Sequence, residues 1–432
     1  MDGRHRVVIV GGGFGGLHTA LQLRRAPVDV TLIDRRNFHL FQPLLYQVAT
    51  GGLSPANIAS PLRALLRRQK NTRVLLGEAI DVDVPGRRLI LSDGAVPYDT
   101  LIVAAGMRDA YFGHDEWERF APGLKSIEDA TEMRRRILFA FEAAERESDP
   151  AKVREWLTFV IVGGGPTGVE LAGAVAEIAH HTLRDNFRNI DPRTAQIVLL
   201  EGADRLLLAY PPDLSAKAAR ALGRLRVTVR TGTLVTDITP DCVTVKTKAG
   251  GEWLAARTAL WAAGVQASPL GRAIAKAAGA ETDRAGRVMV ANDCTVPRHS
   301  EIFVIGDLAH FHDAAGKPLP GVAPVAMQQG RYVARLIEAR LRGESIGPFA
   351  YHDRGNMATI GRNAAVADLG WVRFDGYLAW LAWLFIHLIY LVEFENRLLV
   401  LLQWGWNYFT RNRAARLITG RSDSSFRDMM NR

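Results

Sequence analysis

The fold is decided by the stretch RVVIVGGGFGGLHTALQL at residues 6–23. It begins as an apolar, β-branched run, passes through glycines and continues with apolar residues at helical spacing, which predicts a strand, a turn and a helix. VDVTLID at 28–34 predicts the next strand of a parallel sheet and completes a βαβ unit. The expected class is therefore α/β, with a Rossmann-like dinucleotide-binding domain at the start of the chain.

The glycine turn carries the pattern GxGxxG on Gly11, Gly13 and Gly16. Glycines at these places permit a tight turn and let the helix N-terminus approach a pyrophosphate. Asp34 ends the next predicted strand, where a carboxylate can accept hydrogen bonds from an adenosine ribose. Because the pattern stands between a predicted strand and a predicted helix, we interpret it as a dinucleotide site rather than a chance glycine-rich turn.

A second copy of the same pattern occupies residues 158–168, with Gly165 and Gly168 in its second and third glycine positions. Glu201 ends the next predicted strand, after a polar stretch that we interpret as a longer helix and loop. A carboxylate there favours the free 2′-hydroxyl of NADH and repels the 2′-phosphate of NADPH, although the nearby Arg205 leaves NADPH open. The sequence therefore predicts two Rossmann-like domains.

Two dinucleotide sites in one chain indicate a reductase, in which a bound flavin accepts hydride from a diffusible nicotinamide. A dithiol acceptor needs a cysteine pair soon after the first helix, but residues 37–52 read NFHLFQPLLYQVATGG. The two cysteines, Cys242 and Cys294, lie far apart without metal-like spacing, so we expect neither a disulfide nor a metal site. A quinone, a metal protein or oxygen remains as the acceptor.

Three further positions follow predicted strands. Gly106 and Gly264 end two similar small-residue turns, YDTLIVAAG and RTALWAAG, which suit close passage of the chain beside a ligand. Asp307 ends EIFVIGD, where its carboxylate can hold a flavin ribityl chain or its backbone can face the phosphates. We predict that all three line the cofactor sites.

The net charge of +9 fits a nucleic acid, an anionic membrane surface or phosphate-bearing ligands, and charge alone does not choose among them. The composition of the C-terminal part favours a membrane surface among these three. Residues 378–392 and 398–409 are apolar and rich in Trp and Tyr, with charges between them and arginines after them, including Arg421. Neither piece is long enough to span a bilayer, so we expect a pair of helices lying on the lipid surface. A dimer interface or packing on the core is the alternative.

These residues resemble the type II NADH:quinone oxidoreductases, the single-subunit alternative to the proton-pumping complex. The matching segments cover nearly the whole chain: VVIVGGGFGGL, FHLFQPLLYQVATG, LIVAAG, VIVGGGPTGVELAGA, FVIGDLA, PVAMQQG and the aromatic tail. The resemblance implies a FAD domain interrupted by an NADH domain, docking on the membrane without crossing it, and electron transfer without proton pumping.

The resemblance also implies residue roles. Glu170 matches a family carboxylate near the nicotinamide and the flavin, where it can orient the substrate or relay a proton. The family quinone motif AQxAxQ reads APVAMQ at 323–328, so Gln328 is kept as a quinone contact while Pro324 replaces the first Gln. FAD binding is implied for Gly11, Gly13, Gly16, Asp34 and Asp307, and NADH binding for Gly165, Gly168 and Glu201.

The expected domains are residues 1–115 and 286–345 for FAD, 116–285 for NADH and 346–432 for membrane association. The expected partners are NADH, membrane quinone and the bilayer surface, with room for a homodimer and no nucleic acid. The implied location is peripheral, on the cytoplasmic face of the cell membrane.

Two other functions remain open from the residues alone. One is a soluble NAD(P)H-dependent reductase of a protein electron carrier, with the tail used for dimerisation. The other is a basic flavoprotein that binds nucleic acid or a partner and uses its cofactor structurally.

Overall fold

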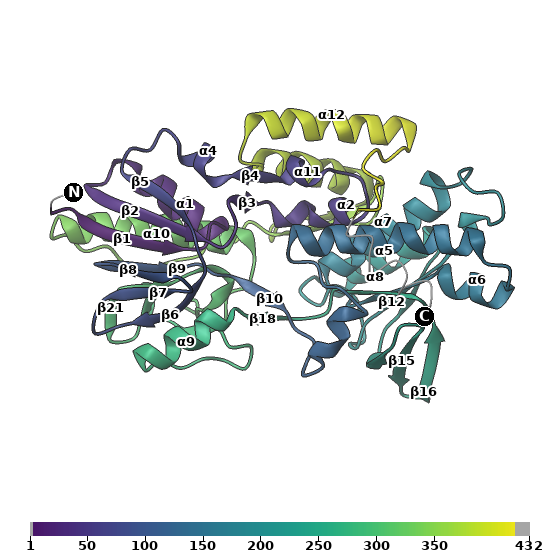
Figure 1. Ribbon diagram of the computed structural model, residues 1–432, viewed down its shortest axis with the longest axis horizontal. Helices are drawn as coiled ribbons and strands as arrows, with labels where there is room; N and C mark the ends of the chain where they lie inside the picture. Colours follow the sequence, from purple (N-terminus) through teal and green to yellow (C-terminus); the bar gives the residue numbers. More distant parts are fainter. Residues whose placement is uncertain (1–2, 420–432) are drawn as a thin grey trace. The chain divides into compact units, whose positions relative to one another are not determined.

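The computed structural model describes residues 3–419 and divides into two compact units (Figure 1). Unit 1 comprises Met1–Leu40, Ala59–Arg108 and Val265–Arg354, and unit 2 comprises Phe41–Ile58, Asp109–Gly264 and Gly355–Arg432. Arg421 and the last part of the predicted 346–432 region lie outside the described residues.

Unit 1 is built on a six-stranded sheet in the order β20-β21-β9-β1-β2-β5. All neighbours are parallel except β20 and β21, which confirms the predicted parallel βαβ unit. The strands are β1 (His5–Val10), β2 (Val28–Asp34), β5 (Thr72–Leu76), β9 (Thr100–Val103), β20 (Thr295–Val296) and β21 (His299–Val304).

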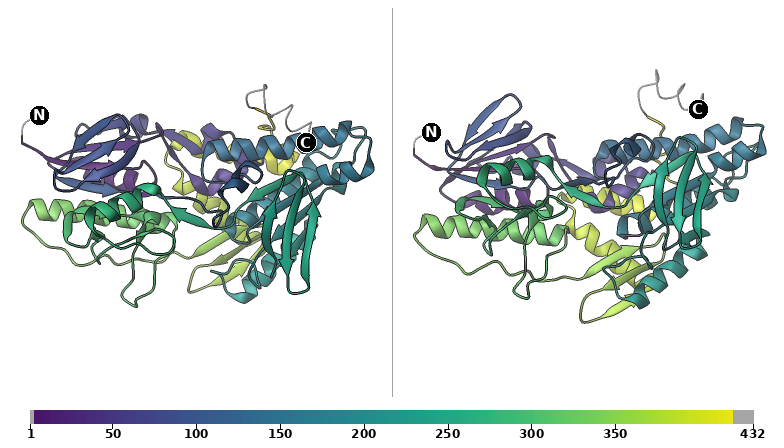
Figure 2. Two further views of the ribbon diagram at one scale, coloured as in Figure 1. Left: turned by 60° about the horizontal axis from the view of Figure 1, so that its bottom comes forward. Right: turned by 90° about the horizontal axis from the view of Figure 1, so that it is seen from below.

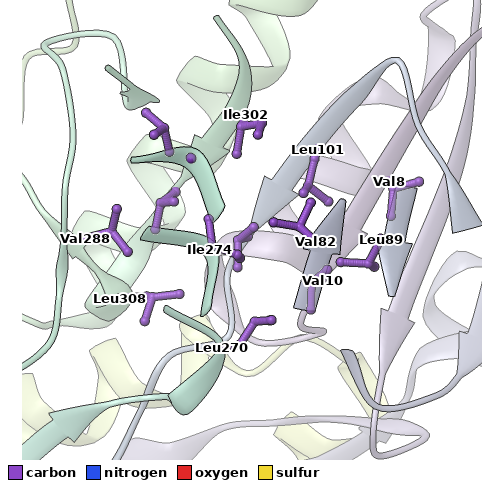
Figure 3. Close-up of a cluster of buried hydrophobic side chains, with 14 of the residues drawn as sticks. Val8, Val10, Val82, Leu89, Leu101, Leu270, Ile274, Val288, Ile302 and Leu308 are labelled. Carbon is purple, nitrogen blue, oxygen red and sulfur yellow. The ribbon is translucent and has the colours of Figure 1, made fainter. Parts of the chain in front are cut away.

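Both faces of this sheet are covered. Helices α1 (Phe14–Gln22) and α10 (Ala323–Leu341) pack against each other so closely that a Cβ on Gly330 would lie 2.5 Å from the Gly15 carbonyl oxygen. Val8 and Val10 point to the other face, where they enter a buried apolar cluster (Figure 3). The cluster is shared with β6 (Ala79–Asp83), β7 (Arg88–Leu91), β8 (Gly94–Pro97) and α9 (Pro269–Ala278).

Unit 1 also contains short connecting elements. These are η1 (Leu23–Arg25), β3 (Phe38–Leu40), β4 (Ala59–Pro61), α4 (Leu62–Leu66), β10 (Met107–Asp109), β18 (Val265–Ala267), β19 (Val288–Met289), η6 (Gly306–Leu308) and β22 (Ala309–His310).

Unit 2 repeats the design with a four-stranded parallel sheet in the order β13-β12-β11-β17. Its strands are β11 (Thr158–Val162), β12 (Gln196–Leu200), β13 (Val227–Arg230) and β17 (Thr258–Trp261), and its helices include α5 (Ile127–Arg146), α6 (Pro150–Trp156), α7 (Pro166–Glu177) and α8 (Pro212–Arg224). An antiparallel sheet of β14 (Leu234–Ile238), β15 (Cys242–Thr247) and β16 (Gly250–Ala255) adds to it (Figure 1 and Figure 2).

Local sequence explains where the main helices of unit 2 begin. Ser126 and Asp129 form a capping box at the start of α5, in which each side chain binds the other residue's backbone N–H. Pro166 occupies the first turn of α7, where its missing N–H costs no helical hydrogen bond. The polar stretch after α7 is a π-helical turn, Ile178–Thr182, followed by turns and η5 (Pro192–Thr194), in agreement with the predicted longer helix and loop.

The C-terminal part of unit 2 contains more than the two helices expected. A three-stranded antiparallel sheet of β23 (Asn356–Thr359), β24 (Ala365–Asp368) and β25 (Arg373–Asp375) precedes α11 (Gly376–Tyr390) and α12 (Phe394–Thr410). The helices break at the predicted polar interruption, and Glu393 is the N-cap residue of α12. Remaining elements of unit 2 are η2 (Gln42–Leu44), α2 (Leu45–Ala49), α3 (Pro55–Ile58) and η3 (Asp115–Arg119).

The compact units differ from the predicted domain ranges. The chain returns to unit 1 at Val265 and not at 286, because α9 places Leu270 and Ile274 in the core of that unit. Residues 41–58, predicted within the first FAD segment, belong to unit 2, as does the chain from Asp109. Unit 1 also keeps residues 346–354.

Candidate functional site

The glycine turn of unit 1 requires glycine for steric reasons. Gly11 has φ +100°, and a Cβ there would lie 2.3 Å from the Ala104 carbonyl oxygen. A Cβ on Gly16 would lie 1.9 Å from the Gly11 carbonyl oxygen, whereas one on Gly13 would meet nothing within 4 Å. The turn therefore lets the strand and α1 approach each other and leaves the N-terminus of α1 accessible to a ligand.

Asp34 lies beside this turn as predicted, but its carboxylate already holds the backbone. Its oxygens accept hydrogen bonds from Gly12 N at 2.6 Å and from Arg36 N at 2.7 Å. Each carboxylate oxygen has a second lone pair, so these bonds leave acceptor capacity for a ribose hydroxyl. Asp34 thus fixes the turn and also remains suited to its predicted ligand.

His39 belongs to the same turn and was given no role by sequence reasoning. Its Nδ1 lies 2.9 Å from the Gly12 carbonyl oxygen, its ring meets Phe14 edge-on, and its buried Nε2 has no partner within the protein. Burial lowers the pKa of His39, so its ring is neutral. A buried polar atom without a partner is costly unless a ligand satisfies it, so this turn fits a dinucleotide. His39 lies within the segment FHLFQPLLYQVATG, and that match to the family was the sequence signal that could have identified it.

The second half of unit 1 supplies Asp307 in η6, directly after Gly306. The Gln329 amide oxygen accepts a hydrogen bond from Gly306 N at 2.7 Å and holds this turn, with the Gln329 side chain fully buried. Gly321 packs against this turn, since a Cβ there would lie 3.3 Å from the Asp307 carboxyl carbon. Gly106 has φ +66° and follows β9, with open space where a Cβ would stand. Asp307 and Gly106, both predicted to line the FAD site, therefore lie just after strands of this unit.

Gln328, the neighbour of Gln329 on α10, binds another part of unit 1. Its amide nitrogen donates to the His352 carbonyl oxygen at 2.9 Å, and its amide oxygen accepts from His352 N at 3.0 Å. The predicted quinone contact is thus engaged by the protein's own backbone. Pro324 stands in the first turn of α10, a position that tolerates proline because no N–H is needed there.

The glycine turn of unit 2 has the same steric logic. Gly163 has φ +109° and faces Ala262, and a Cβ on Gly168 would lie 1.8 Å from the Gly163 carbonyl oxygen. Gly165 is the N-cap residue of α7 and has no atom within 4 Å of a Cβ position. Gly264 has φ +77°, and the Phe112 ring occupies the place of a Cβ. The predicted glycines of the second site are therefore gathered around one helix start and one strand end.

Glu201 ends β12 beside this second turn. Its carboxylate accepts hydrogen bonds from Gly164 N at 2.6 Å and from Ala203 N at 2.8 Å, the same arrangement as Asp34. Arg205, which left NADPH open in the sequence, donates its guanidinium hydrogens to the carbonyl oxygens of Leu208 and Tyr210 at 2.9 Å each. These bonds hold the Arg205 side chain against the loop, while the Glu201 carboxylate lies at the glycine turn.

Glu170 lies in the first turns of α7 and is only 9% exposed. Burial raises the pKa of its carboxyl to about 8, and Thr359 N donates a long hydrogen bond of 3.4 Å to it. Tyr46 on α2 is also buried, and burial followed by the Glu170 charge raises the pKa of its hydroxyl. Glu170 is therefore mostly protonated at neutral pH and holds a transferable proton.

Hydrogen bonds join the C-terminal helix α12 to the segment 45–53 of the same unit. Trp404 Nε1 donates to the Gln47 amide oxygen at 2.7 Å, and the Asn407 amide donates to the Gly52 carbonyl oxygen at 3.0 Å. Farther on, Arg413 forms a largely buried ion pair with Glu177 at 2.7 Å. His387 stacks on Trp383 with its pKa lowered to about 4 by burial, so it is a neutral packing residue.

The opposite face of these helices is apolar and exposed. Phe385 is 62% exposed, Leu402 62% and Phe409 84%, although all three side chains are large and apolar. Within residues 3–419, no helix combines the length and the apolar character needed to cross a membrane. The exposed apolar residues of this outer face are Tyr377, Leu378, Leu381, Phe385, Ile389, Leu398, Leu399, Leu401, Leu402, Trp406 and Phe409.

Two family models match the chain. Residues 5–330 match the pyridine nucleotide-disulphide oxidoreductase model, and residues 353–412 match the NDH2 C-terminal domain. The chain is 48% identical over 429 residues to the type II NADH:quinone oxidoreductase NdhA of Mycobacterium tuberculosis, covering 97% of this chain and 90% of the relative. A type II NADH:quinone oxidoreductase of Staphylococcus haemolyticus is 29% identical, covering 84% and 89%.

Solved structures agree on the fold. NDH2 of Plasmodium falciparum in complex with NADH superposes with a TM-score of 0.87 at 19% identity, covering 97% of this chain and all of that one. The sulfide:quinone oxidoreductase of Aquifex aeolicus gives a TM-score of 0.71 at 18% identity, covering 98% and 94%. At these identities the likeness concerns the fold alone.

Proposed function

Because this chain belongs to the type II NADH:quinone oxidoreductase family, we propose how its residues divide the transfer of electrons from NADH through FAD to quinone. The enzyme is a single chain with two nucleotide-binding units, and its cofactors are FAD and NADH. The observation that carries the division of roles is the pair of glycine turns, one in each unit, with a buried protonated carboxyl on the helix that follows the second.

We assign the turn of unit 1 to FAD. The N-terminus of α1 and the open side of Gly13 suit the pyrophosphate, and the unpartnered His39 Nε2 supplies a hydrogen-bonding atom. Asp307 and Gly106 stand where two parallel strands end, which is where cofactors bind in such sheets. Once bound, FAD supplies the redox chemistry, taking hydride from NADH and passing two electrons to quinone.

The turn of unit 2 is assigned to NADH. Gly165 leaves room for the pyrophosphate at the start of α7, Gly168 lets that helix approach the turn, and Glu201 presents a carboxylate to the ribose. A negative charge at that point repels a 2′-phosphate, and the guanidinium N–H groups of Arg205 are engaged by loop carbonyls rather than directed to a 2′-phosphate. NADH is therefore the preferred donor.

Glu170 is proposed to hold a proton beside the nicotinamide. It lies two residues after Gly168 on the helix whose N-terminus receives the dinucleotide. Quinol formation consumes two protons in all, and a carboxyl with a pKa of about 8 can give up one near neutral pH and take it back from water. Gln328 is proposed as the quinone contact, which requires its amide to exchange the His352 backbone for a quinone carbonyl.

The division of roles is tested by the two half-reactions. Rapid mixing of the yellow protein with NADH should bleach the flavin absorbance, and added quinone should restore it. Glu201→Gln should change only the first half-reaction and Gln328→Ala only the second. A protein that does not bleach with NADH contradicts the proposal.

The outer face of α11 and α12 is proposed to lie on the cytoplasmic surface of the cell membrane. Its exposed aromatic and aliphatic side chains match the lipid-water boundary, and the net charge of +9 favours anionic lipid. Phe409→Glu should lower sedimentation with anionic vesicles, while Trp253→Glu, at a residue 70% exposed on β16, should not. If Phe409→Glu instead separates a homodimer and leaves vesicle binding intact, this face is a subunit interface.

A further inference from the structure

Two histidines outside the nucleotide sites converge on one point of unit 1. His310 ends β22 and His312 follows two residues later, so in extended chain both side chains project to the same side. Their Nε2 atoms lie 3.2 Å apart, and the ring centroids are 4.5 Å apart. Neither ring takes part in the reaction described above.

We propose that His310 and His312 form a binding site for a late divalent transition metal, such as Zn²⁺ or Cu²⁺. Metal–nitrogen bonds of about 2.0–2.1 Å place two imidazole nitrogens about 2.9 Å apart at a right angle and about 3.3 Å apart at a tetrahedral angle. The observed 3.2 Å falls between these values. Both histidines can therefore bind one ion through Nε2 with little movement.

The surroundings of His310 orient it for this role. Its Nδ1 lies 2.9 Å from the Asp283 carboxylate, which Arg287 holds through Nε at 2.7 Å and through its backbone N–H at 2.8 Å. A carboxylate that accepts the Nδ1 hydrogen fixes the tautomer in which Nε2 presents a lone pair, and this partner is the usual second layer of a histidine metal site. The Arg287 guanidinium also lies 2.9 Å from Nδ1 and can only donate, so it competes with Asp283 for this nitrogen. Nε2 offers its lone pair to a metal in the tautomer in which Nδ1 donates to Asp283.

In this pair, His312 is the residue whose ring can change tautomer. Without an ion, its Nε2–H can donate to His310 Nε2, which gives the same 3.2 Å separation. Binding needs only that the proton move from Nε2 to Nδ1 of His312, and the exposed ring lets water accept the new N–H.

The choice of ion follows from the ligands. Imidazole suits zinc, copper and nickel, and for the same ligands Cu²⁺ binds more tightly than Zn²⁺. Among residues 3–419, no cluster of three or more His, Cys, Asp or Glu side chains suited to a metal is found, so water completes the coordination here. The sequence expectation of no metal came from cysteine spacing and did not consider this pair.

The test uses the full, flavin-loaded chain without an affinity tag, stripped with a chelator and titrated with Cu²⁺. We expect one tightly bound ion per chain whose electron paramagnetic resonance shows nitrogen ligands. His310→Asn and His312→Asn should each weaken binding at least tenfold, and Asp283→Asn about tenfold, the lower end for a lost second-layer partner.

His299→Asn is the matched control, because His299 lies 3.4 Å from the Glu301 carboxylate but is not one of the converging pair. Flavin content reports whether each variant folds, and the exposed His312 makes His312→Asn the safest change. The proposal is overturned if binding does not saturate, or if it survives both substitutions of the pair.

Discussion

The two glycine turns share most of their backbone hydrogen bonds. They differ in the group that contacts the carbonyl oxygen of the middle glycine, Gly12 in the first turn and Gly164 in the second. Gly11 N and Gly163 N donate to the ends of the neighbouring strands at 2.8 Å in both units, and a carboxylate binds the N–H of Gly12 or Gly164 at 2.6 Å. The carbonyl of Gly12, however, lies against the His39 ring, whereas that of Gly164 accepts a backbone hydrogen bond from Leu207 N at 2.8 Å.

In the first turn a side chain satisfies the carbonyl oxygen of the middle glycine, whereas in the second turn a backbone N–H does so. The His39 ring carries a second nitrogen that stays unpartnered within the protein, so the first turn gains from a ligand that remains bound. The second turn is satisfied by its own chain and can release its ligand without exposing a buried polar atom. The contrast agrees with a resident FAD and a diffusing NADH.

The largest effects should come from Gly16→Ala and Gly168→Ala. Each Cβ would lie within 2 Å of a backbone oxygen, so the helix must move at a cost of about 3 kcal/mol or more. Gly16→Ala should yield colourless protein, while Gly168→Ala should stay yellow and lose NADH-dependent bleaching. Absorbance and thermal unfolding measure both. Gly13→Ala and Gly165→Ala are the controls for thermal unfolding, because a Cβ at either position meets no protein atom within 4 Å. A yellow Gly16→Ala protein would contradict the assignment.

The next largest effect concerns the position two residues after the last glycine, His18 in α1 and Glu170 in α7. Burial, helped by Arg331, lowers the pKa of His18 to about 4, and burial raises the pKa of Glu170 to about 8. Both groups are therefore neutral at pH 7, despite their opposite chemistry.

The contributions of the two groups to stability should change in opposite directions with pH, over windows that overlap between pH 4.5 and 6.5. The unfolded chain protonates His18 below pH 6.5, so stability falls as pH drops from 6.5 towards 4. The unfolded chain ionises Glu170 above pH 4.5, so its contribution falls as pH rises from 4.5 to 8. In urea unfolding at several pH values, His18→Gln should remove the loss of stability as pH drops from 6.5 towards 4, and Glu170→Gln should remove the loss as pH rises from 4.5 to 8. Unchanged slopes would show that neither group is held neutral.

His39→Leu breaks the feature that distinguishes the first turn. It removes the partner of the Gly12 carbonyl and should cost about 1–3 kcal/mol for an unsatisfied buried group. Flavin should be lost faster on dilution, measured by fluorescence of released FAD, while NADH affinity stays unchanged. Leu207→Ala is the matched change in the second turn, because it keeps the backbone N–H. Equal flavin loss in both variants would remove the contrast between the turns.

Much of the fold and of both turns could be predicted because their constraints are local. A strand, three glycines, a helix and a carboxylate follow one another within a few dozen residues, and sterics at Gly16 and Gly168 permit no other side chain. The partners of Gly12, Arg205 and Gln328 could not be predicted, because they depend on which loop packs where. The β23–β25 sheet was missed because its strands are only three or four residues long.

A smaller effect should follow from exchanging the two carboxylates for amides. Glu201→Gln keeps an oxygen for Gly164 N but removes the charge, so the preference for NADH over NADPH, measured as a ratio of kcat/KM values, should fall roughly tenfold. Asp34→Asn makes the same change in the first turn and should leave that ratio intact while loosening FAD. If Glu201→Gln leaves the ratio unchanged, the selection against NADPH is not electrostatic.

The smallest effect distinguishes two neighbouring glutamines at the end of the first nucleotide site. Gln329 is buried and holds Gly306 N, so Gln329→Ala should loosen FAD, whereas Gln328 is only partly buried and its amide binds the His352 backbone. Gln328→Ala should therefore leave flavin content and bleaching by NADH intact and slow reoxidation by quinone a few-fold, since one exposed amide hydrogen bond contributes about 1 kcal/mol. Reoxidation at the normal rate would show that Gln328 only binds the His352 backbone. The quinone contact would then belong to another residue.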